Sequence, residues 1–360
     1  MGSAKTAARG IKSSRRRQRF PGDPGKGKYY IGWSVSTSNL TDENGNALSY
    51  INTVTNYCQK TPDIFHDYIP DDLAGDFADK FDVAIGYGGI ASLTFKLWEV
   101  TAPGSGNPDR GGNEDHLAIV AGDADSQLLT AVNACKARAP YPAWLCYYHE
   151  PEDFVQNTTQ ATNYRAAYRY VVDFFRDQGV TNVAWTTILS APFVFTDREW
   201  YRIHPDWKGT GPAAASDWHT GADQMCDFFG FDTYNAGIGS TTYRFWETNV
   251  RQPIQSTMDA DGFTAAYGIV PWGIFEHGMS ANTNPYPVWT DDWGPDVRDW
   301  ALTNCVGFCY WNSNTTGPGP AANPTAPRYD FKPVSDPTYP SKLNAWRMIT
   351  GSSSNFTPPV

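Results

Sequence analysis

The strongest constraint on the fold is the alternation, from Tyr29 onward, of short apolar segments with amphipathic segments. Short apolar runs bounded by turn-forming residues are typical of buried strands. Eight such runs follow one another along the chain. The candidate strands are Tyr29–Ser34, Asp63–Tyr68, Ser92–Val100, Ala143–Glu150, Asn182–Leu189, Cys226–Tyr234, Ile269–Glu276 and Val306–Trp311.

Helical patterns lie between most of these strands. The clearest is Thr159–Asp177, where apolar residues recur at the spacing of one helix face. Strands that alternate with helices form parallel sheets. Eight such units in about 330 residues predict an α/β fold of the (β/α)₈ (TIM) barrel type. The other candidate helices are Leu48–Gln59, Ala124–Ala137, Phe245–Met258, Pro295–Leu302 and Lys342–Ile349.

Long loops are expected after two of the strands, over Ala102–Asn113 and Asn312–Pro327, on the face where barrel active sites are built. The first strand is not followed by a glycine-rich phosphate loop, which argues against a nucleotide-binding fold.

The charge is unevenly distributed along the chain. Residues 1–28 hold nine Lys or Arg and one Asp, a charge of +8, whereas the remainder has 19 basic and 37 acidic residues, a charge of −18. The first segment has too little apolar surface to fold alone. We therefore expect a basic arm or tether at 1–28, a catalytic barrel at 29–350 and a flexible tail at 351–360. The acidic barrel is not expected to bind nucleic acid, whereas the arm suits an acidic surface on a larger assembly.

Six cysteines show no metal-site spacing, and we expect neither a metal nor a cofactor. Five of them fall in or beside apolar segments, which suits buried thiols, although the sequence leaves a disulfide open. No apolar stretch is long enough for a membrane span. The basic run Arg15–Arg17 leads into polar residues without the apolar core of a signal peptide, so no export signal is expected.

Two candidate strands end in acidic residues. The fourth ends in His149-Glu150 and the seventh ends in Glu276. Polar residues at the carboxyl ends of barrel strands are candidates for catalysis, and strands on opposite sides of a small barrel converge across its mouth. Two carboxylates placed there can act as proton donor and nucleophile, because their mutual repulsion separates their pKa values.

Other interpretations apply to each residue alone. A single strand-end glutamate is often solvated or salt-bridged, and His149 can be a hydrogen-bonded core histidine. The His149-Glu150 pair also begins a zinc-helix motif, but that motif needs a histidine where the chain has Asp153. The aromatic share is 15%, with 14 Trp. Most rings must fill the core, but some can stack on sugars, and we name Trp33, Trp98 and Trp272 as candidates.

The strand-end motifs resemble the clan A retaining glycoside hydrolases, and within that clan family 26, the β-mannanase type. The resemblance implies that Glu150 is the acid/base and Glu276 the nucleophile. It also implies that Tyr234, in the strand Cys226–Tyr234, steadies the nucleophile and that Trp311 floors the cleavage subsite. We expect His149 to bind a sugar hydroxyl or the nucleophile, and Asp232 to bind the sugar or a neighbouring loop. The chain departs from the family in the residues after Glu150, Pro151-Glu152-Asp153, and this departure leaves mannan specificity open.

The predicted function is that of a retaining endo-glycosidase acting on a polysaccharide. The alternative is a structural tail or surface protein whose barrel binds glycan without cutting it. A phage tail protein fits both hypotheses, because lysis would release it without an export signal. The expected location is therefore a virion tail or the extracellular space after release, with residues 1–28 as the attachment to the virion or another assembly.

Overall fold

The structure is a computed structural model that describes the barrel and much of its surroundings. Several predicted features lie outside the described residues: Trp98, Cys58, both long loops apart from Asn113, and the helix Leu48–Gln59 apart from Thr55. The described residues are 20–34, 55, 60–69, 73, 76–97, 113–190, 194, 200–210, 214–235, 251–267, 271–279, 297–299, 305–311, 347, 349 and 351–359.

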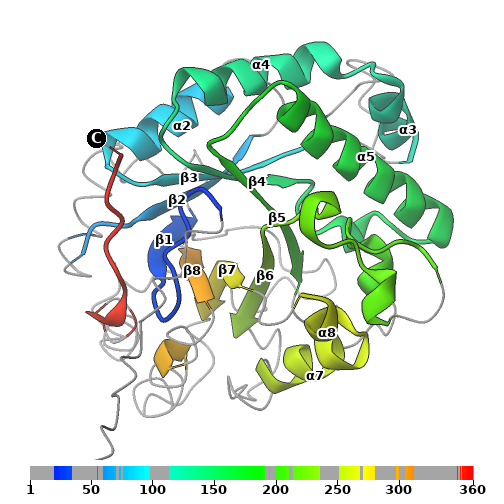
Figure 1. Ribbon diagram of the computed structural model, residues 1–360. Coiled ribbons are helices and arrows are strands. Elements are labelled where there is room, and N and C mark those ends of the chain that lie inside the picture. The colour runs from blue at the N-terminus through cyan, green and yellow to red at the C-terminus, as the bar shows by residue number, and fades with distance from the viewer. Residues whose placement is uncertain are drawn as a thin grey trace, which may run out of the picture.

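Eight parallel strands close into a barrel, with each strand paired to the next and β8 paired to β1 (Figure 1). This confirms the predicted (β/α)₈ fold, and each strand overlaps one of the eight segments expected from the sequence. The strands are β1 Tyr30–Ser34, β2 Ile64–Ile69, β3 Ile90–Phe95, β4 Ala143–Tyr147, β5 Val183–Ser190, β6 Phe228–Asn235, β7 Trp272–Met279 and β8 Cys305–Trp311.

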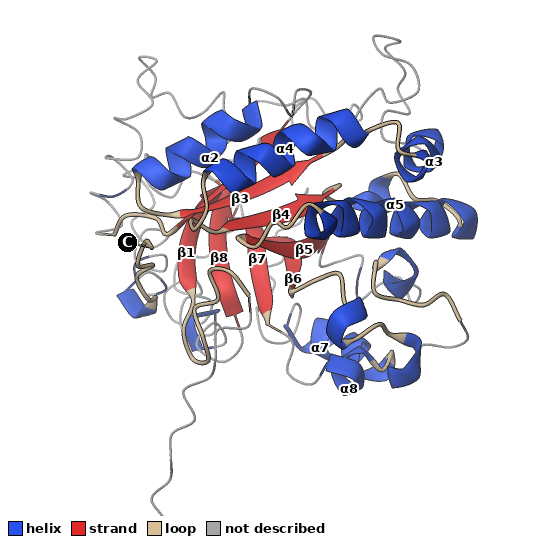
Figure 2. Ribbon diagram, turned by 45° about the horizontal axis from the view of Figure 1, so that its top comes forward, coloured by secondary structure: helices blue, strands red, loops and turns tan. Residues whose placement is uncertain are grey.

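The helices lie on the outside of the barrel (Figure 2). α5 begins one residue before its predicted start, after Asn157, whose side chain accepts a hydrogen bond from the Gln160 N–H. The sequence missed α3 because its burial is inverted: His116 is buried whereas Leu117 and Val120 are exposed. None of the described helices combines the length and the apolarity of a membrane span. The helices are α2 Asp76–Gly86, α3 Asn113–Ala121, α4 Asp125–Ala137, α5 Thr158–Asp177, α7 Gln252–Ala260 and α8 Phe263–Tyr267.

Trp144 fills the barrel interior near the amino ends of the strands, which we call the bottom of the barrel; the mouth is the opposite end, where the strands end. Its ring lies 4.9 Å from Phe228 and 6.3 Å from Phe275, measured between ring centroids. The opposite wall carries Gly307, where an added Cβ would lie 3.0 Å from the Trp144 ring. An eight-stranded barrel has an interior just wide enough for side chains, so a large ring on one strand requires a very small residue on another.

The five described cysteines are all buried, as predicted, and none of them forms a disulfide with another described residue.

The described part of the predicted arm packs under the barrel. Phe20 is 5% exposed and contacts Trp144 and Phe228, while the Trp144 indole N–H donates to the Pro21 carbonyl oxygen. The folded unit therefore includes residues before Tyr29, from Phe20 onward among those that the structure describes. The sequence missed this because a single phenylalanine in a basic segment gives no periodic signal.

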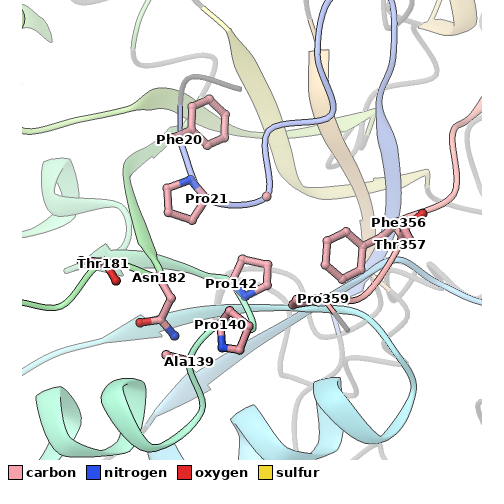
Figure 3. A pocket seen from close by; sticks show the side chains of 11 residues that line it. Phe20, Pro21, Ala139, Pro140, Pro142, Thr181, Asn182, Phe356, Thr357 and Pro359 are labelled. Carbon is pink, nitrogen blue, oxygen red and sulfur yellow. The ribbon is translucent and has the colours of Figure 1, made fainter. Parts of the chain in front are cut away.

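The predicted tail 351–360 also docks on the barrel. The Ser354 N–H donates to the Tyr29 carbonyl oxygen, and the Phe356 N–H donates to Asp63. Phe20 and Phe356 border an open groove of about 560 Å³, which lies at the amino ends of β4 and β5 (Figure 3). Residues 351–359 are thus attached to the bottom of the barrel, and the groove lies on the face opposite Glu150.

A truncation series tests this boundary. A chain starting at Phe20 should melt like the full chain, whereas one starting at Tyr29 should melt at a lower temperature, because it loses the ring that closes the barrel bottom. Phe20→Ala should lower the free energy of unfolding by about 3–5 kcal/mol. Urea unfolding would measure this, with Lys26→Ala, at an exposed position, as the control. Equal stability of both truncated chains would mean that Phe20 contributes nothing.

Candidate active site

The segment after β4 has an unusual backbone that fixes the two residues of the His-Glu pair. Tyr148 and Glu150 both have positive φ, 64° and 46°. Such conformations cost non-glycine residues about 1–3 kcal/mol each and persist only where neighbours hold them. Here the Tyr148 N–H donates to the carbonyl oxygen of Phe95 in β3, and the Glu150 N–H donates to the carbonyl oxygen of Ile188 in β5. Glu150 is thus anchored at the mouth of the barrel by strands on both sides.

His149 lies beneath the mouth in contact with Asp232 of β6. Its Nε2 is 2.6 Å from Asp232 Oδ2 and 3.8 Å from Glu150 Oε2. Burial lowers the pKa of His149 to about 4, so the imidazole is neutral at pH 7. The Tyr68 hydroxyl lies 3.2 Å from the same nitrogen. The structure therefore brings Asp232 of β6 into contact with the His149-Glu150 pair that the sequence predicts at the end of β4.

Glu150 combines accessibility with a raised pKa. Its side chain is 32% exposed, so it is open to the mouth, whereas Asp232 is 1% exposed. Partial burial, reinforced by the negative charge of Asp232, raises the pKa of Glu150 to about 7. A carboxyl group that stays protonated near neutral pH is suited to donate a proton.

A β-bulge in β7 sets the position of Glu276. Ile274 pairs with Phe231, but the next pair along the strands is Glu276 with Asp232, so Phe275 is an extra residue. The Phe275 ring lies in the barrel interior, 5.7 Å from the Phe228 ring centroid. Strict alternation after an inward Phe275 would place Glu276 on the outer face of the sheet. The bulge instead puts it at the same register position as the inward Asp232.

Two further predicted residues occupy inward register positions. Trp311 pairs with Ser34, and Tyr234 lies two positions beyond Asp232 on β6. The side chains of Trp311, Tyr234 and Glu276 lie outside the described part of the structure. Their roles, and the distance between the two carboxyl groups, therefore stay predictions.

The structure corrects two of the predicted sugar-binding tryptophans. Trp33 is 2% exposed and Trp272 is 3% exposed, and both belong to the core between the strands and the helices. Trp272 packs edge-on against Phe231, with ring centroids 5.5 Å apart. Both side chains point from their strands toward the helices, whereas a sugar-binding ring must face the mouth of the barrel. The aromatic content of a sequence does not reveal which way a given ring points.

Sequence reasoning missed two polar residues around Glu150, Tyr68 and Lys96, and noted Glu152 only as part of the stretch after Glu150. Tyr68 of β2 contacts His149, as described above. Lys96, just beyond β3, places its ammonium 4.4 Å from the Tyr148 ring centroid and 4.5 Å from that of Phe154. Glu152 bonds to the end of β5. Polar residues recur at every second position toward the ends of β2 and β3. This pattern would have indicated that Tyr68 and Lys96 share the inward face with the site.

Among the described residues, two groups of three side chains bring ligand-type atoms within 4.8 Å of one another. One is His149, Glu150 and Asp232. The other is buried and consists of His204, Asp206 and Cys226. Asp206 uses its two carboxylate oxygens to accept hydrogen bonds from the Met225 and Cys226 N–H groups. We interpret this second group as a structural link between the loop 204–206 and the segment just before β6.

Several solved structures with the same fold are glycoside hydrolases. A family 26 endo-β-1,4-mannanase from Cellulomonas fimi is 16% identical, covers 94% of this chain and 76% of its own, and has a TM-score of 0.56. The family 26 mannanase domain from Bacillus sp. JAMB-750 is 15% identical, with coverages of 92% and 88% and a TM-score of 0.55. A family 5 xyloglucan-specific endo-β-1,4-glucanase from a metagenomic library is 13% identical, with coverages of 89% and 96% and a TM-score of 0.53.

The chain has the fold of these glycoside hydrolases. This confirms the fold that the strand-end motifs implied. At such low identities the likeness concerns the fold. No protein-family model and no curated protein matches the sequence.

Substitution of Trp272 distinguishes a core residue from a sugar-binding one. Because its ring is buried against Phe231, Trp272→Ala should lower the free energy of unfolding by about 3–5 kcal/mol. Phe154→Ala, which removes a ring that is 38% exposed, serves as the control and should cost much less. Denaturant unfolding of both variants is the measurement. A stable Trp272→Ala variant that has only weakened glycan binding would restore the cleft assignment.

Proposed function

We propose that the protein is a retaining endo-glycosidase that hydrolyses a polysaccharide, with Glu150 as acid/base and Glu276 as nucleophile. The observation that carries the proposal is the state of Glu150: accessible at the barrel mouth, with a pKa raised to about 7 and held by strands on both sides. The fold shared with glycoside hydrolases of families 26 and 5 also supports a glycosidase function.

In this mechanism Glu150 protonates the glycosidic oxygen while Glu276 attacks the anomeric carbon. The leaving sugar departs with the proton, and a glycosyl ester forms on Glu276. The ionised Glu150 then takes a proton from water, which attacks the ester and releases the second product. Each carboxyl group returns to its starting state, so the cycle needs no cofactor.

His149 and Asp232 prepare this site before substrate arrives. The Nε2 of the neutral His149 ring lies 2.6 Å from Asp232 Oδ2, and this contact holds the ring beside Glu150. The Asp232 charge favours the protonated form of Glu150, the form that the first step requires. Both residues are buried beneath the mouth, and Asp232 shares its register position with Glu276 on the neighbouring strand.

A reducing-end assay on a panel of polysaccharides, including bacterial cell-wall glycans, tests the proposed activity. The panel should include β-1,4-mannan, because the two family 26 neighbours are named as β-1,4-mannanases. New reducing ends on at least one polysaccharide are expected. Tight binding without new reducing ends on any of them would favour the alternative of a non-catalytic glycan-binding tail protein.

The two carboxylates should respond differently to removal of their charge. Glu276→Gln should abolish turnover on all substrates, because no other nucleophile replaces it. Glu150→Gln should slow cleavage of polysaccharide far more than cleavage of aryl glycosides with good leaving groups, which need little protonation. The kcat/KM values on both substrate types are the measurement. Equal losses on the two substrates in Glu150→Gln would contradict the acid/base role.

The pH profile should report the protonation of Glu150. Glu150 donates a proton only while it is protonated, so kcat/KM on polysaccharide should be high below its pKa and fall as the pH rises through about 7. Glu150→Gln should lack this alkaline limb. A profile for the unmodified protein that stays flat from pH 6 to pH 9 would mean that Glu150 is not the proton donor.

In a crystal structure, the carboxyl groups of Glu150 and Glu276 should lie roughly 5–5.5 Å apart, the separation of a retaining pair. A separation nearer to about 9 Å would leave room for a water molecule and favour inversion instead.

We further propose that the basic residues 1–28 attach the enzyme to a virion tail or another assembly. The position of Phe20 supports this proposal, because the chain enters the fold at the bottom of the barrel, opposite Glu150. An attachment at this end would leave the mouth free for glycan. Co-sedimentation of the full chain and of a chain starting at Phe20 with the candidate assembly tests it.

A further inference from the structure

The turn after Glu150 is fastened to β5 by a side chain. Pro151–Asp153 form a 3₁₀ turn, closed by hydrogen bonds from the Phe154 and Val155 N–H groups to the Pro151 carbonyl oxygen. From this turn, Glu152 Oε1 accepts a hydrogen bond of 2.5 Å from the Ser190 N–H. Ser190 is the last residue of β5.

This contact continues the pairing between β4 and β5 after β4 has ended. Backbone pairing of the two strands runs up to Leu145 and Trp185. Beyond it, the Glu150 N–H donates to the Ile188 carbonyl oxygen, and the next link is the Ser190 N–H to Glu152. The carboxyl group of Glu152 thus takes the place of a strand carbonyl. It holds the chain two residues after Glu150.

The far end of this link leads back to the partner of His149. Ser190 pairs in register with Asp232 on β6. The turn that follows Glu150 is therefore tied to the strand position beside Asp232, whose charge adds to the effect of burial in raising the pKa of Glu150. Movement of the turn would change the distance between the two carboxyl groups.

Glu152 is half-buried, which distinguishes this contact from a fully exposed surface interaction. Its Oε2 is buried and has no hydrogen-bond partner among the described residues. Burial raises its pKa to about 8, so the group is mostly neutral at pH 7 and remains a competent acceptor through Oε1. A buried carboxyl oxygen without a hydrogen-bond partner is costly. Glu152 also belongs to the Pro151-Glu152-Asp153 stretch that follows Glu150.

We propose that Glu152 is a positioning residue that fixes the Glu150 carboxyl group at its half-buried place beside His149 and Asp232. Its catalytic consequence rests on the proposed function, but its structural consequence does not. With the link in place, Glu150 stays in the partly desolvated mouth near Asp232. Without it, the strained segment at Glu150 can relax and the carboxyl group can turn toward solvent.

The pKa of Glu150 is the decisive readout, because it requires no substrate. It can be measured by carbon-13 NMR titration of protein labelled at the glutamate carboxyl carbons, with the resonance assigned by Glu150→Gln. Glu152→Ala should lower the pKa of Glu150 from about 7 toward the ordinary carboxylic range. Glu152→Gln keeps an oxygen acceptor at the same place and should leave the pKa raised.

Two further variants separate positioning from stability. Asn157→Ala removes the N-cap of α5, just beyond the turn, and should lower the melting temperature without moving the pKa of Glu150. Glu152→Asp withdraws the carboxyl group by one methylene and should lower the pKa of Glu150 by less than Glu152→Ala does. It provides the test if Glu152→Ala does not fold. A Glu150 pKa that is unchanged in Glu152→Ala, or that falls equally in Glu152→Ala and Glu152→Gln, would overturn the proposal.

Kinetics then test the catalytic consequence. Glu152→Ala should lower kcat/KM on polysaccharide by roughly 10- to 100-fold, as expected for a misplaced catalytic group, with a smaller loss on aryl glycosides. Glu152→Gln should restore most of the activity. If the unmodified protein cleaves no glycan, the proposed function fails while the NMR titration still decides the role of Glu152. If it cleaves glycan and Glu152→Ala is fully active with an unchanged pH profile, only the positioning role fails.

Discussion

The filling of the barrel interior is the constraint on which the rest of the structure depends. Trp144 occupies the lower barrel, and Phe20, Phe228 and Phe275 close around it from below and from the side. An eight-stranded barrel has no room for a second large residue at every level, which explains the glycine facing Trp144 at position 307. The same packing recruits the segment before β1, because the barrel bottom would otherwise be open to water.

The bulge in β7 follows from this packing. Phe275 must face inward to complete the aromatic cluster with Phe228, and a regular strand would then turn Glu276 outward. One extra residue resolves the conflict, since it lets Phe275 pack in the core while Glu276 pairs with Asp232. The core needs Phe275 to face the barrel interior, and the candidate site needs Glu276 at the register position of Asp232. The bulge lies between these two residues and Ile274, where both needs have to be met.

The sequence predicted the features that depend on periodicity and on strand order. Prediction failed where the direction of a side chain, or a single long-range contact, determines the position of a residue. The eight strands and α5 were found because each carries a repeated apolar pattern, and Glu150 was found because it ends such a pattern. Trp33 and Trp272 were misassigned because one residue of phase separates the mouth from the helix-facing core. Phe20 and Glu152 each act through contacts with residues distant in sequence, Trp144 and Ser190, which no local pattern reveals.

The strained backbone at Tyr148 and Glu150 explains why so many contacts converge on this segment. In a regular strand, successive side chains would alternate between the barrel interior and the face that packs against the helices. Left-handed residues break that alternation, so Tyr148 packs near His116 while His149 reaches Asp232 and Glu150 stays at the mouth. Each such residue favours other conformations, so the arrangement lasts only while Phe95, Ile188 and Ser190 hold it on both sides. The raised pKa of Glu150 is therefore a property of the whole strand end, since it requires the burial and the nearby Asp232 charge that only this strained conformation provides.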